Sequence, residues 1–297
     1  MSRIRRASLQ TGLLMVSRPP RTAEVQRFWR RRYFARVSTD RWDPAQYARF
    51  ERERSAPFFD LLDLVAPCPG GRVADLGCGT GELTRALHER TGASTTVGLD
   101  SSAAMLERSA EHAGVGVTFE RGDIARWTPP EPVDVVFSNA ALHWVDDHPA
   151  LLARLTSVLA PGGQLAVQVP ANHDHASHLV AERVAGEEPF RNALGGYVRR
   201  TPVLAPEQYA ALLHHLGYES RHVRLQVYLH VLPEPAAVVE WVKGTLLTDY
   251  RRRLAEEAYD EFVARYRALL LAELPDERPY PFTFRRILLW GRTSSGP

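Results

Sequence analysis

The stretch of sequence that decides the fold is Asp75-Leu76-Gly77-Cys78-Gly79-Thr80-Gly81, which continues the short apolar run Arg72-Val73-Ala74. A strand-length apolar run that ends in closely spaced glycines, with a helical pattern over residues 82–90 behind it, is typical of the first unit of an open α/β sheet. Glycines are needed in such a turn because it is tight and because a side chain would hold a ligand away from the backbone. We therefore expect a buried strand, a ligand-binding turn and a helix in succession.

Strand and helix patterns alternate beyond this turn, in the order that implies a parallel sheet. The expected strands cover residues 72–76, 95–99, 115–120, 133–137, 164–169, 223–230 and 282–290. The expected helices cover residues 82–90, 102–112, 149–159 and 206–216, and residues 235–271 are largely helical. The sequence predicts an α/β fold, namely a doubly wound, mostly parallel, seven-stranded Rossmann-like sheet with a helical lid.

The chain divides by composition into a basic arm and a mixed, folded part. The first forty residues hold ten arginines and only two acidic residues, although the net charge of the whole chain is only +2. We expect residues 1–40 to be a disordered arm and residues 41–297 to form one domain, with lid insertions at 171–205 and 233–280. Nucleic-acid binding, a transit peptide and a translation start at Met15 are the alternatives for the arm.

Composition also limits the class of protein. With 44% hydrophobic residues the chain can bury a large core, and no apolar run approaches the roughly 20 residues that span a bilayer. Two cysteines, Cys68 and Cys78, are too few for a disulfide framework, so we expect a cytoplasmic protein. Histidines 173, 175 and 178 lack an accompanying carboxylate pattern, and no metal site is predicted.

Three aspartates follow three successive predicted strands. Asp75 lies beside the glycine turn, where its carboxylate would repel a phosphate and attract the ammonium of an amino-acid ligand. Asp100 is placed to accept hydrogen bonds from two ribose hydroxyls. Asp123 is placed to accept from an adenine amino group while Ile124 packs on the ring. Each aspartate alone could be an ordinary helix cap, but together they occupy the edge where open α/β sheets bind ligands.

The spacing of the glycines argues against a dinucleotide-binding dehydrogenase. That fingerprint is G-x-G-x-x-G, whereas here the third glycine, Gly81, comes one residue early. The run Asp75 to Gly81, together with Asp100, Gly122-Asp123 and the run Ser138 to Trp144, resembles the class I S-adenosylmethionine-dependent methyltransferases. This resemblance implies S-adenosylmethionine as the cofactor. The residues expected to bind it are Asp75, Gly77, Gly79, Gly81, Asp100, Asp123, Ile124 and Asn139.

Further runs narrow the resemblance to a subfamily. Residues 42–47, 139–144, 168–172, 240–245 and 284–286 are similar to the trans-aconitate 2-methyltransferases. The implied reaction is methyl transfer to a carboxylate of a small polycarboxylic acid, most specifically trans-aconitate, with an O-methyl ester as product. A carboxylate with a pKa near about 4 is ionised at neutral pH, so no general base is required.

A polycarboxylate acceptor requires cations in the segments that fold over the site. The substrate candidates are therefore Lys243, Arg285 and Arg286, with His143 and Trp144 beside the donor methyl group. His143 is also the one candidate for a chemical role, either orienting the acceptor or acting as a base for a less acidic one. Trp42 and Tyr47 either close over the cofactor or are core aromatics.

Other functions remain open at this point. Another small metabolite or an acyl-carrier substrate is the alternative acceptor, because acceptor loops diverge readily on this fold. A non-catalytic cofactor-binding protein is a further alternative. We expect no membrane partner, and nucleic acid is disfavoured because the Asn-Pro-Pro-aromatic run of base amino methylation is absent where Ser138-Asn139-Ala140-Ala141 stands.

Overall fold

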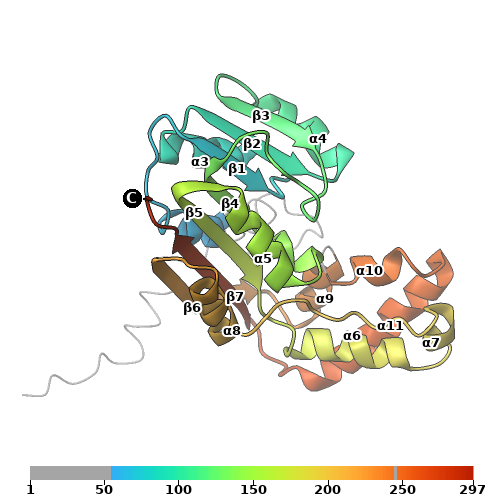
Figure 1. Cartoon of the computed structure of the whole chain (residues 1–297). Coiled ribbons are helices and arrows are strands. Elements are labelled where there is room, and N and C mark those ends of the chain that lie inside the picture. The colour runs from blue at the N-terminus through green and yellow to red at the C-terminus, as the bar shows by residue number, and fades with distance from the viewer. Residues whose placement is uncertain (1–54, 244–245, 297) are drawn as a thin grey trace, which may run out of the picture. The chain divides into compact units, whose positions relative to one another are not determined.

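The computed structural model describes residues 55–243 and 246–296, so the expected arm and the aromatic residues Trp42 and Tyr47 lie outside the described residues. Seven strands form one sheet in the order β3-β2-β1-β4-β5-β7-β6 (Figure 1). They are β1 (Arg72–Leu76), β2 (Thr95–Asp100), β3 (Val117–Arg121), β4 (Val133–Asn139), β5 (Leu159–Pro170), β6 (Ser220–Leu232) and β7 (Tyr280–Arg292). Only β7 runs antiparallel to its neighbours, which confirms the predicted mostly parallel sheet.

Helices occupy the connections between the strands. They are a first helix at 55–62, α3 (Glu82–Thr91), α4 (Ala103–Ser109), α5 (His148–Ser157), α6 (Ala176–Gly186), α7 (Phe190–Ala193), α8 (Pro206–His215), α9 (Ala236–Lys243), α10 (Thr248–Arg251) and α11 (Glu256–Glu273). The short 3₁₀ helices η1 (Ala110–His112) and η2 (Leu142–Trp144) complete the set. None of the helices within the described ranges is both long and apolar enough to cross a membrane.

Two predicted elements differ from the structure at their boundaries. The expected helix at 102–112 is α4 followed by η1, and the expected strand from Val115 begins only at Val117. β5 begins at Leu159 rather than at Gln164, because the Pro161-Gly162-Gly163 turn is taken up as a register shift against β4. A bulge of this kind lets a turn sequence continue inside a strand.

The sheet is covered on both faces, which explains its apolar strands. One core holds β1, β4, β5 and β7 residues such as Val135 and Leu288 together with Phe58 of the first helix and Leu87 of α3. The core on the other face contains Val136 and side chains of α5 and α8. Alternate residues along each strand therefore point to different cores.

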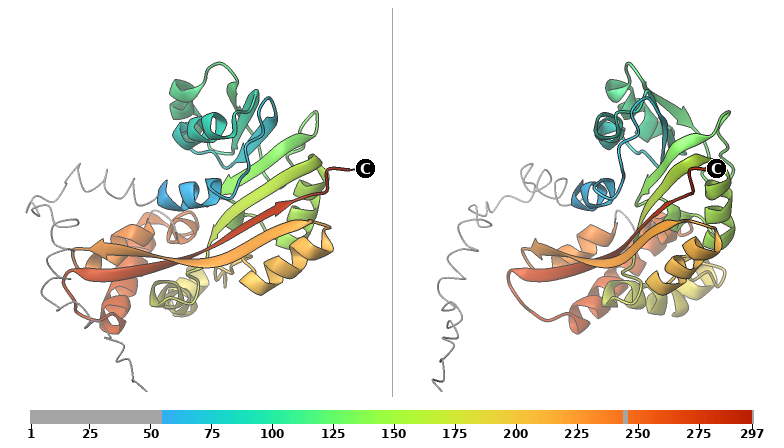
Figure 2. Two further views of the ribbon diagram at one scale, coloured as in Figure 1. Left: turned by 90° about the vertical axis from the view of Figure 1, so that its left-hand side faces the viewer. Right: turned by 60° about the vertical axis from the view of Figure 1, so that its left-hand side comes forward.

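A third core lies at the far ends of β6 and β7. These two strands are long and extend beyond the rest of the sheet (Figure 2). Their residues Leu232, Phe282 and Phe284 pack with α6, α7, α9, α10 and α11. We call these five helices the helical layer. It carries large buried rings, among them Tyr250 stacked on Phe262 with centroids 4.8 Å apart.

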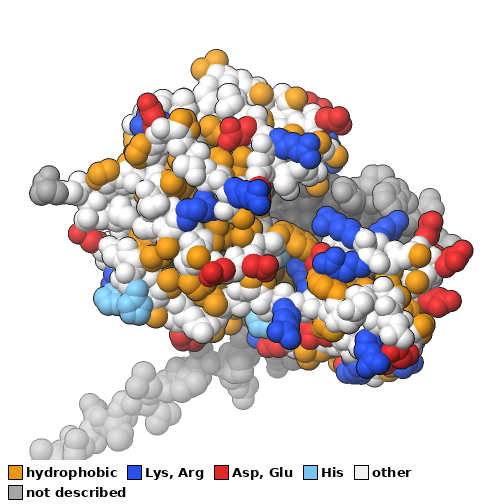
Figure 3. All heavy atoms as spheres, turned by 45° about the vertical axis from the view of Figure 1, so that its right-hand side comes forward, with side chains coloured by type: hydrophobic (Ala, Val, Ile, Leu, Met, Phe, Trp, Pro, Cys, Tyr) orange, Lys and Arg blue, Asp and Glu red, His pale blue; other side chains and the backbone are white. Residues whose placement is uncertain are grey.

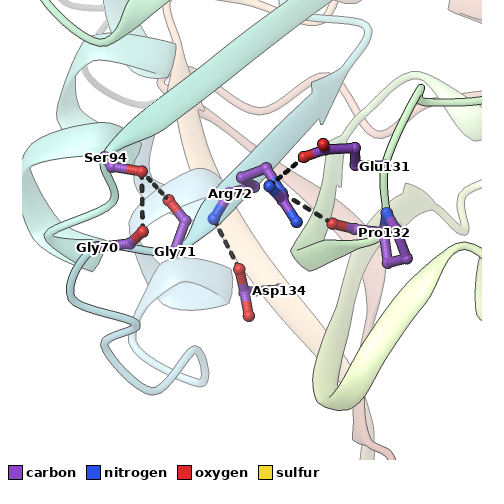
Figure 4. A network of polar contacts seen from close by, with 7 residues as sticks. All are labelled: Gly70, Gly71, Arg72, Ser94, Glu131, Pro132 and Asp134. Carbon is purple, nitrogen blue, oxygen red and sulfur yellow. Dashed lines mark hydrogen bonds and ion pairs between the residues drawn. The ribbon is translucent and has the colours of Figure 1, made fainter.

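The amino ends of the central strands are held by polar contacts (Figure 4). The Asp134 carboxylate at the start of β4 accepts a 2.7 Å hydrogen bond from the backbone N–H of Arg72 at the start of β1. The Arg72 side chain donates to the carbonyl of Pro132 at 3.0 Å. The hydroxyl of Ser94, just before β2, donates to the carbonyl of Gly71 at 3.1 Å. These contacts align β1, β2 and β4 from the edge of the sheet opposite to the glycine turn.

The glycine turn is locked against the residues that follow β4. Gly77 adopts φ 86°, in the left-handed region, and a Cβ built on it would lie 2.1 Å from the Cβ of Ala141. Gly79 also has a positive φ, 58°, yet a Cβ there would meet nothing within 4 Å. Gly77 is therefore required for close packing, whereas Gly79 faces open space.

The two glycines predict different costs for the same substitution. Gly79→Ala is expected to cost about 1–2 kcal/mol, the usual penalty for a side chain in the left-handed region. Gly77→Ala adds the collision with Ala141 and is expected to cost about 2–5 kcal/mol in total. Denaturant unfolding of both variants without ligand measures the difference. Equal losses of stability would contradict the packing described here.

Candidate functional site

A row of polar side chains crosses one face of the sheet at the carboxyl ends of its strands. Asp75 pairs in register with Gly98 of β2 and Phe137 of β4, so Asp75, Asp100 and Asn139 share one face. The same register continues through Gln168 of β5 to Arg286 of β7. We call these five residues the polar row. Its members come from five different strands.

Asp75 is a buried carboxylate, with 3% of the residue exposed. Burial is the largest cause that raises its pKa, to about 6; the nearby Asp100 raises it further, and a hydrogen bond from Thr84 opposes the shift. The Thr84 hydroxyl donates to Oδ2 over 2.6 Å. Since burial disfavours the charged form, a cation brought to this carboxylate would be strongly attracted.

Asp100 connects the end of β2 to the glycine turn. Its Oδ2 accepts from the backbone N–H of Gly79 at 3.0 Å, and its Oδ1 accepts from the N–H of Ser102 at 2.8 Å. Each carboxylate oxygen has a second lone pair, so the group can still accept from a ligand. The side chain is therefore structural and available at the same time.

Asp123 and Ile124 lie beyond β3, on the other side of the turn. Asp123 is exposed and accepts from the N–H of Ala125 at 2.9 Å, which leaves its Oδ2 without a described partner. The Cδ1 of Ile124 lies 3.7 Å from the position of a Cβ on Gly77. The structure thus brings Ile124 next to the glycine turn, as a wall for a flat apolar group.

The end of β4 contains an unsatisfied polar atom. Asn139 Oδ1 is buried and has no hydrogen-bond partner among the described residues. The next residue, Ala140, has a φ of 54° and donates from its N–H to the carbonyl of Gln168 at 3.0 Å. A non-glycine residue in the left-handed region is strained and is typical of functional turns. The amide of Asn139 fits a ligand that lies over the glycine turn.

His143 in η2 is kept neutral by its surroundings. Its Nδ1 is buried without a partner in the described part of the chain, and its ring lies 4.8 Å from the ring of Trp144. Burial, followed by the positive charges of Arg199 and Arg286 and the neighbouring His148 and His178, lowers its pKa to about 3. A neutral imidazole can donate or accept a hydrogen bond, but at pH 7 it is a weak base.

The three cationic candidates occupy different environments. Arg286 is 7% exposed and donates from Nη1 to Gln168 Oε1 at 3.2 Å, with its guanidinium 4.8 Å from the ring of Phe284. Arg285 points to the opposite face of β7 and forms an ion pair with Asp174. Lys243 pairs with Glu240 of its own helix at 2.9 Å. Among these three, the geometry brings only Arg286 to the polar row.

Residues outside the predicted set also face this region. Gln168 is fully buried, and its Nε2 has no partner among the described residues. Arg199 lies over the ring of Trp144, with 4.4 Å from its guanidinium carbon to the ring centroid. A polar residue inside the apolar strand 165–169 could have identified Gln168. Nothing in the sequence distinguishes Arg199 from the many surface arginines.

The histidine run beyond β5 is part of a hydrogen-bonded cap. Ser177 Oγ lies 2.9 Å from His175 Nδ1 and 3.2 Å from His178 Nδ1. The described residues contain no group of three or more His, Cys, Asp or Glu arranged to hold a metal. These contacts explain the position of the two imidazoles at the start of α6.

Charge is unevenly distributed along the polar row. Carboxylates lie on β1 and β2, and a buried guanidinium lies on β7. The surface over the helical layer carries further Lys and Arg side chains, beside hydrophobic ones (Figure 3). The arrangement can hold a ligand with cationic and hydroxyl groups at one end of the row and an anion at the other.

Comparison with known proteins agrees with this division. A family model described as a methyltransferase domain matches residues 73–163. A trans-aconitate 2-methyltransferase of Deinococcus radiodurans is 46% identical over 253 residues, which are 83% of this chain and 96% of the relative. A protein of the same name from Streptomyces coelicolor is 40% identical over 266 residues, covering 86% of this chain and 88% of the relative.

A solved structure shows the similarity of fold alone. The YcgJ protein of Bacillus subtilis superposes with a TM-score of 0.52 at 18% identity, covering 80% of this chain and all of that chain. Together with the near full-length match to the sequence relatives, this confirms the resemblance that the glycine turn and its aspartates indicate. The chain is a methyltransferase and belongs to the trans-aconitate 2-methyltransferase family.

Proposed function

We propose that the protein transfers a methyl group from S-adenosylmethionine to a carboxylate of a small polycarboxylic acid, trans-aconitate, and releases the O-methyl ester. The observation that carries the choice of acceptor is the buried guanidinium of Arg286, on the same sheet face as the aspartates and beside neutral His143. A monocarboxylate or a neutral metabolite has no use for a cation at this place. The names of the relatives point to the same acceptor.

The residues present fit the cofactor. Asp75 would attract its ammonium, Asp100 would accept from its ribose hydroxyls, and Asp123 and Ile124 would hold its adenine. Asn139 offers the unsatisfied buried acceptor, and Gly79 leaves open space at the turn. The backbone at Gly77, Gly79 and Gly81 adopts positive φ at all three positions, which lets the loop approach a ligand closely.

Positioning is the main chemical task of the site. S-adenosylmethionine supplies a methyl group that its sulfonium has already activated. One acceptor carboxylate oxygen attacks that carbon in line, so an O–C bond forms while the S–C bond breaks, and no proton moves. Holding the reactants at near-attack distance can contribute about 7–11 kcal/mol. We assign this role to Arg286 and Trp144, with His143 orienting the carboxylate by a hydrogen bond rather than removing a proton.

The helical layer is the candidate lid. Residues 171–205 and 233–280 contain α6, α7, α9, α10 and α11, and we propose that they cover the acceptor and exclude water. Both cysteines are free thiols, which suits the reducing cytoplasm where we place the reaction. Arg285 and Lys243 hold acidic partners within this layer and its border, so we assign them a supporting rather than a binding role.

Replacing Asp100 tests the cofactor site. Asp100→Ala is expected to weaken S-adenosylmethionine binding tenfold or more, about 1.4 kcal/mol, because it removes the acceptor for the ribose hydroxyls. Asp134→Ala is the matched control, since Asp134 also binds a backbone N–H but lies at the opposite edge of the sheet. Calorimetric titration should show a loss of affinity for Asp100→Ala alone. Unchanged affinity in a folded Asp100→Ala variant would remove this residue from the site.

Asp75 predicts a trade between stability and binding. Its folded pKa of about 6 exceeds the ordinary 3.8, so the folded state binds the proton more tightly and the parent loses stability as pH rises from about 4 to 6. Asp75→Asn is expected to lack this loss and to be about 1–3 kcal/mol more stable at pH 7 without ligand. Its affinity for S-adenosylmethionine should fall tenfold or more. Denaturation at pH 4.5 and 7 checks the sign, and a less stable variant at pH 7 would contradict it.

Incubation with labelled S-adenosylmethionine and a panel of polycarboxylic acids tests the function itself, with methyl esters identified by mass. The parent is expected to methylate trans-aconitate. Arg286→Gln should raise the acceptor KM tenfold to hundredfold at unchanged cofactor affinity, the effect of losing one charge-assisted pair. Arg285→Gln, its neighbour on the opposite face, should raise it less than threefold. If the parent ignores every polycarboxylate offered, the acceptor is another small metabolite and only the methyltransferase assignment stands.

A further inference from the structure

A second group of cationic and hydrogen-bonding side chains meets where η2 contacts the helical layer. It consists of His143 and Trp144 of η2, His178 of α6, Arg199 from the segment before α8, and Tyr250 of α10. We call these five residues the Arg199 cluster. They come from four separate segments, and all but His143 and Trp144 lie in the residues that distinguish this chain from a bare sheet domain.

Arg199 is fixed in place at the centre of this cluster. Its guanidinium lies over the Trp144 ring at 4.4 Å. Its Nε lies 3.6 Å from Asp249 Oδ2, and its Nη1 donates to the carbonyl of Leu246 at 3.4 Å. Both contacts are long compared with the 2.7–2.9 Å of a strong charge-assisted bond. They orient the guanidinium without saturating its five N–H donors.

Two buried groups beside Arg199 lack partners. Tyr250 is fully buried, and its hydroxyl has no partner among the described residues. Its ring cannot turn toward water because it is stacked on Phe262. His143 Nδ1 is in the same position on the other side of Trp144. Buried donors are normally satisfied, so unpaired ones at a cationic site point to an acceptor-rich ligand.

The imidazoles of the cluster do not add charge. Burial is the largest cause that lowers the pKa values of His143 and His178 to about 3, and Arg199 lowers both further. Both rings are therefore neutral at pH 7 and can donate one hydrogen bond each. The positive charge comes from Arg199 on one side of His143 and from Arg286, which also acts on it, on the other side.

We propose that Arg199, with the Tyr250 hydroxyl, binds a carboxylate of the acceptor other than the one that is methylated, on the side of His143 away from Arg286. Arg199 is thus a specificity-determining residue that selects acceptors with several carboxylates. A planar fork stacked on an indole is preorganised for bidentate binding of a carboxylate. The inference rests on the proposed function for the identity of the acceptor, but the anion subsite can be measured without turnover.

The direct test is binding of tricarballylate, a saturated tricarboxylate that keeps all three carboxylates, to the full chain saturated with S-adenosylhomocysteine. Calorimetry is expected to show binding to the parent and a loss of about tenfold to hundredfold in Arg199→Gln. Arg199→Lys should recover part of the loss, because it restores the charge but not the fork. Arg253→Gln is the matched control. Arg253 also stacks on an aromatic ring, Tyr197 at 3.8 Å, but is exposed and outside the cluster.

Turnover supplies the second measurement. In Arg199→Gln the KM for trans-aconitate should rise tenfold to hundredfold with kcat within threefold of the parent, while a monocarboxylate acceptor should be affected less than threefold. Unchanged tricarballylate binding in a folded Arg199→Gln variant overturns the inference, as does an equal loss for mono- and tricarboxylates. If the parent binds tricarballylate through Arg199 but methylates no polycarboxylate, the proposed function fails and the anion subsite stands.

Discussion

The register of the parallel strands is the constraint on which the site depends. Asp75, Asp100 and Asn139 lie on one face only because β1 pairs Asp75 with Gly98 and Phe137. A shift of any strand by one residue would turn its polar end group into the opposite core and bring an apolar side chain to the ligand edge. The packing of Gly77 on Ala141 and the contact between Arg72 and Asp134 fix this register from both ends of the strands.

Much of this arrangement follows from the sequence, because its signals are local. Asp75 and Asp100 each come directly after an apolar run, and the rule that ligands bind at the carboxyl ends of parallel strands places them together. Arg199 could not be found in this way. Its position depends on Trp144 and Asp249, which are about fifty residues away on either side and meet it only through the packing of the helical layer. The sequence also could not rank Arg285 against Arg286, because that choice requires the phase of β7, which is set by pairing with β5.

The polar row joins two requirements that would conflict at a single point. A cationic cofactor calls for carboxylates, and an anionic acceptor calls for a guanidinium. The sheet separates them across its width, with acids on β1 and β2 and Arg286 on β7, and the uncharged amides of Asn139 and Gln168 between them. This spacing limits the attraction between the two sets of charges, which would otherwise neutralise each other in a partly buried site. It also leaves the reacting atoms over the least charged part of the sheet.

The position of β7 has a consequence for how the chain matures. β7 is the last strand to be made, yet it lies inside the sheet, between β5 and β6. During synthesis, which proceeds at about 5–20 residues per second, the strands β1 to β5 can associate early, whereas β6 has no partner until residues 280–292 leave the ribosome. Arg286 arrives with the same strand. A nascent chain can therefore build the cofactor side of the sheet seconds before it has an acceptor side, and the acceptor side is completed by the same event that closes the fold.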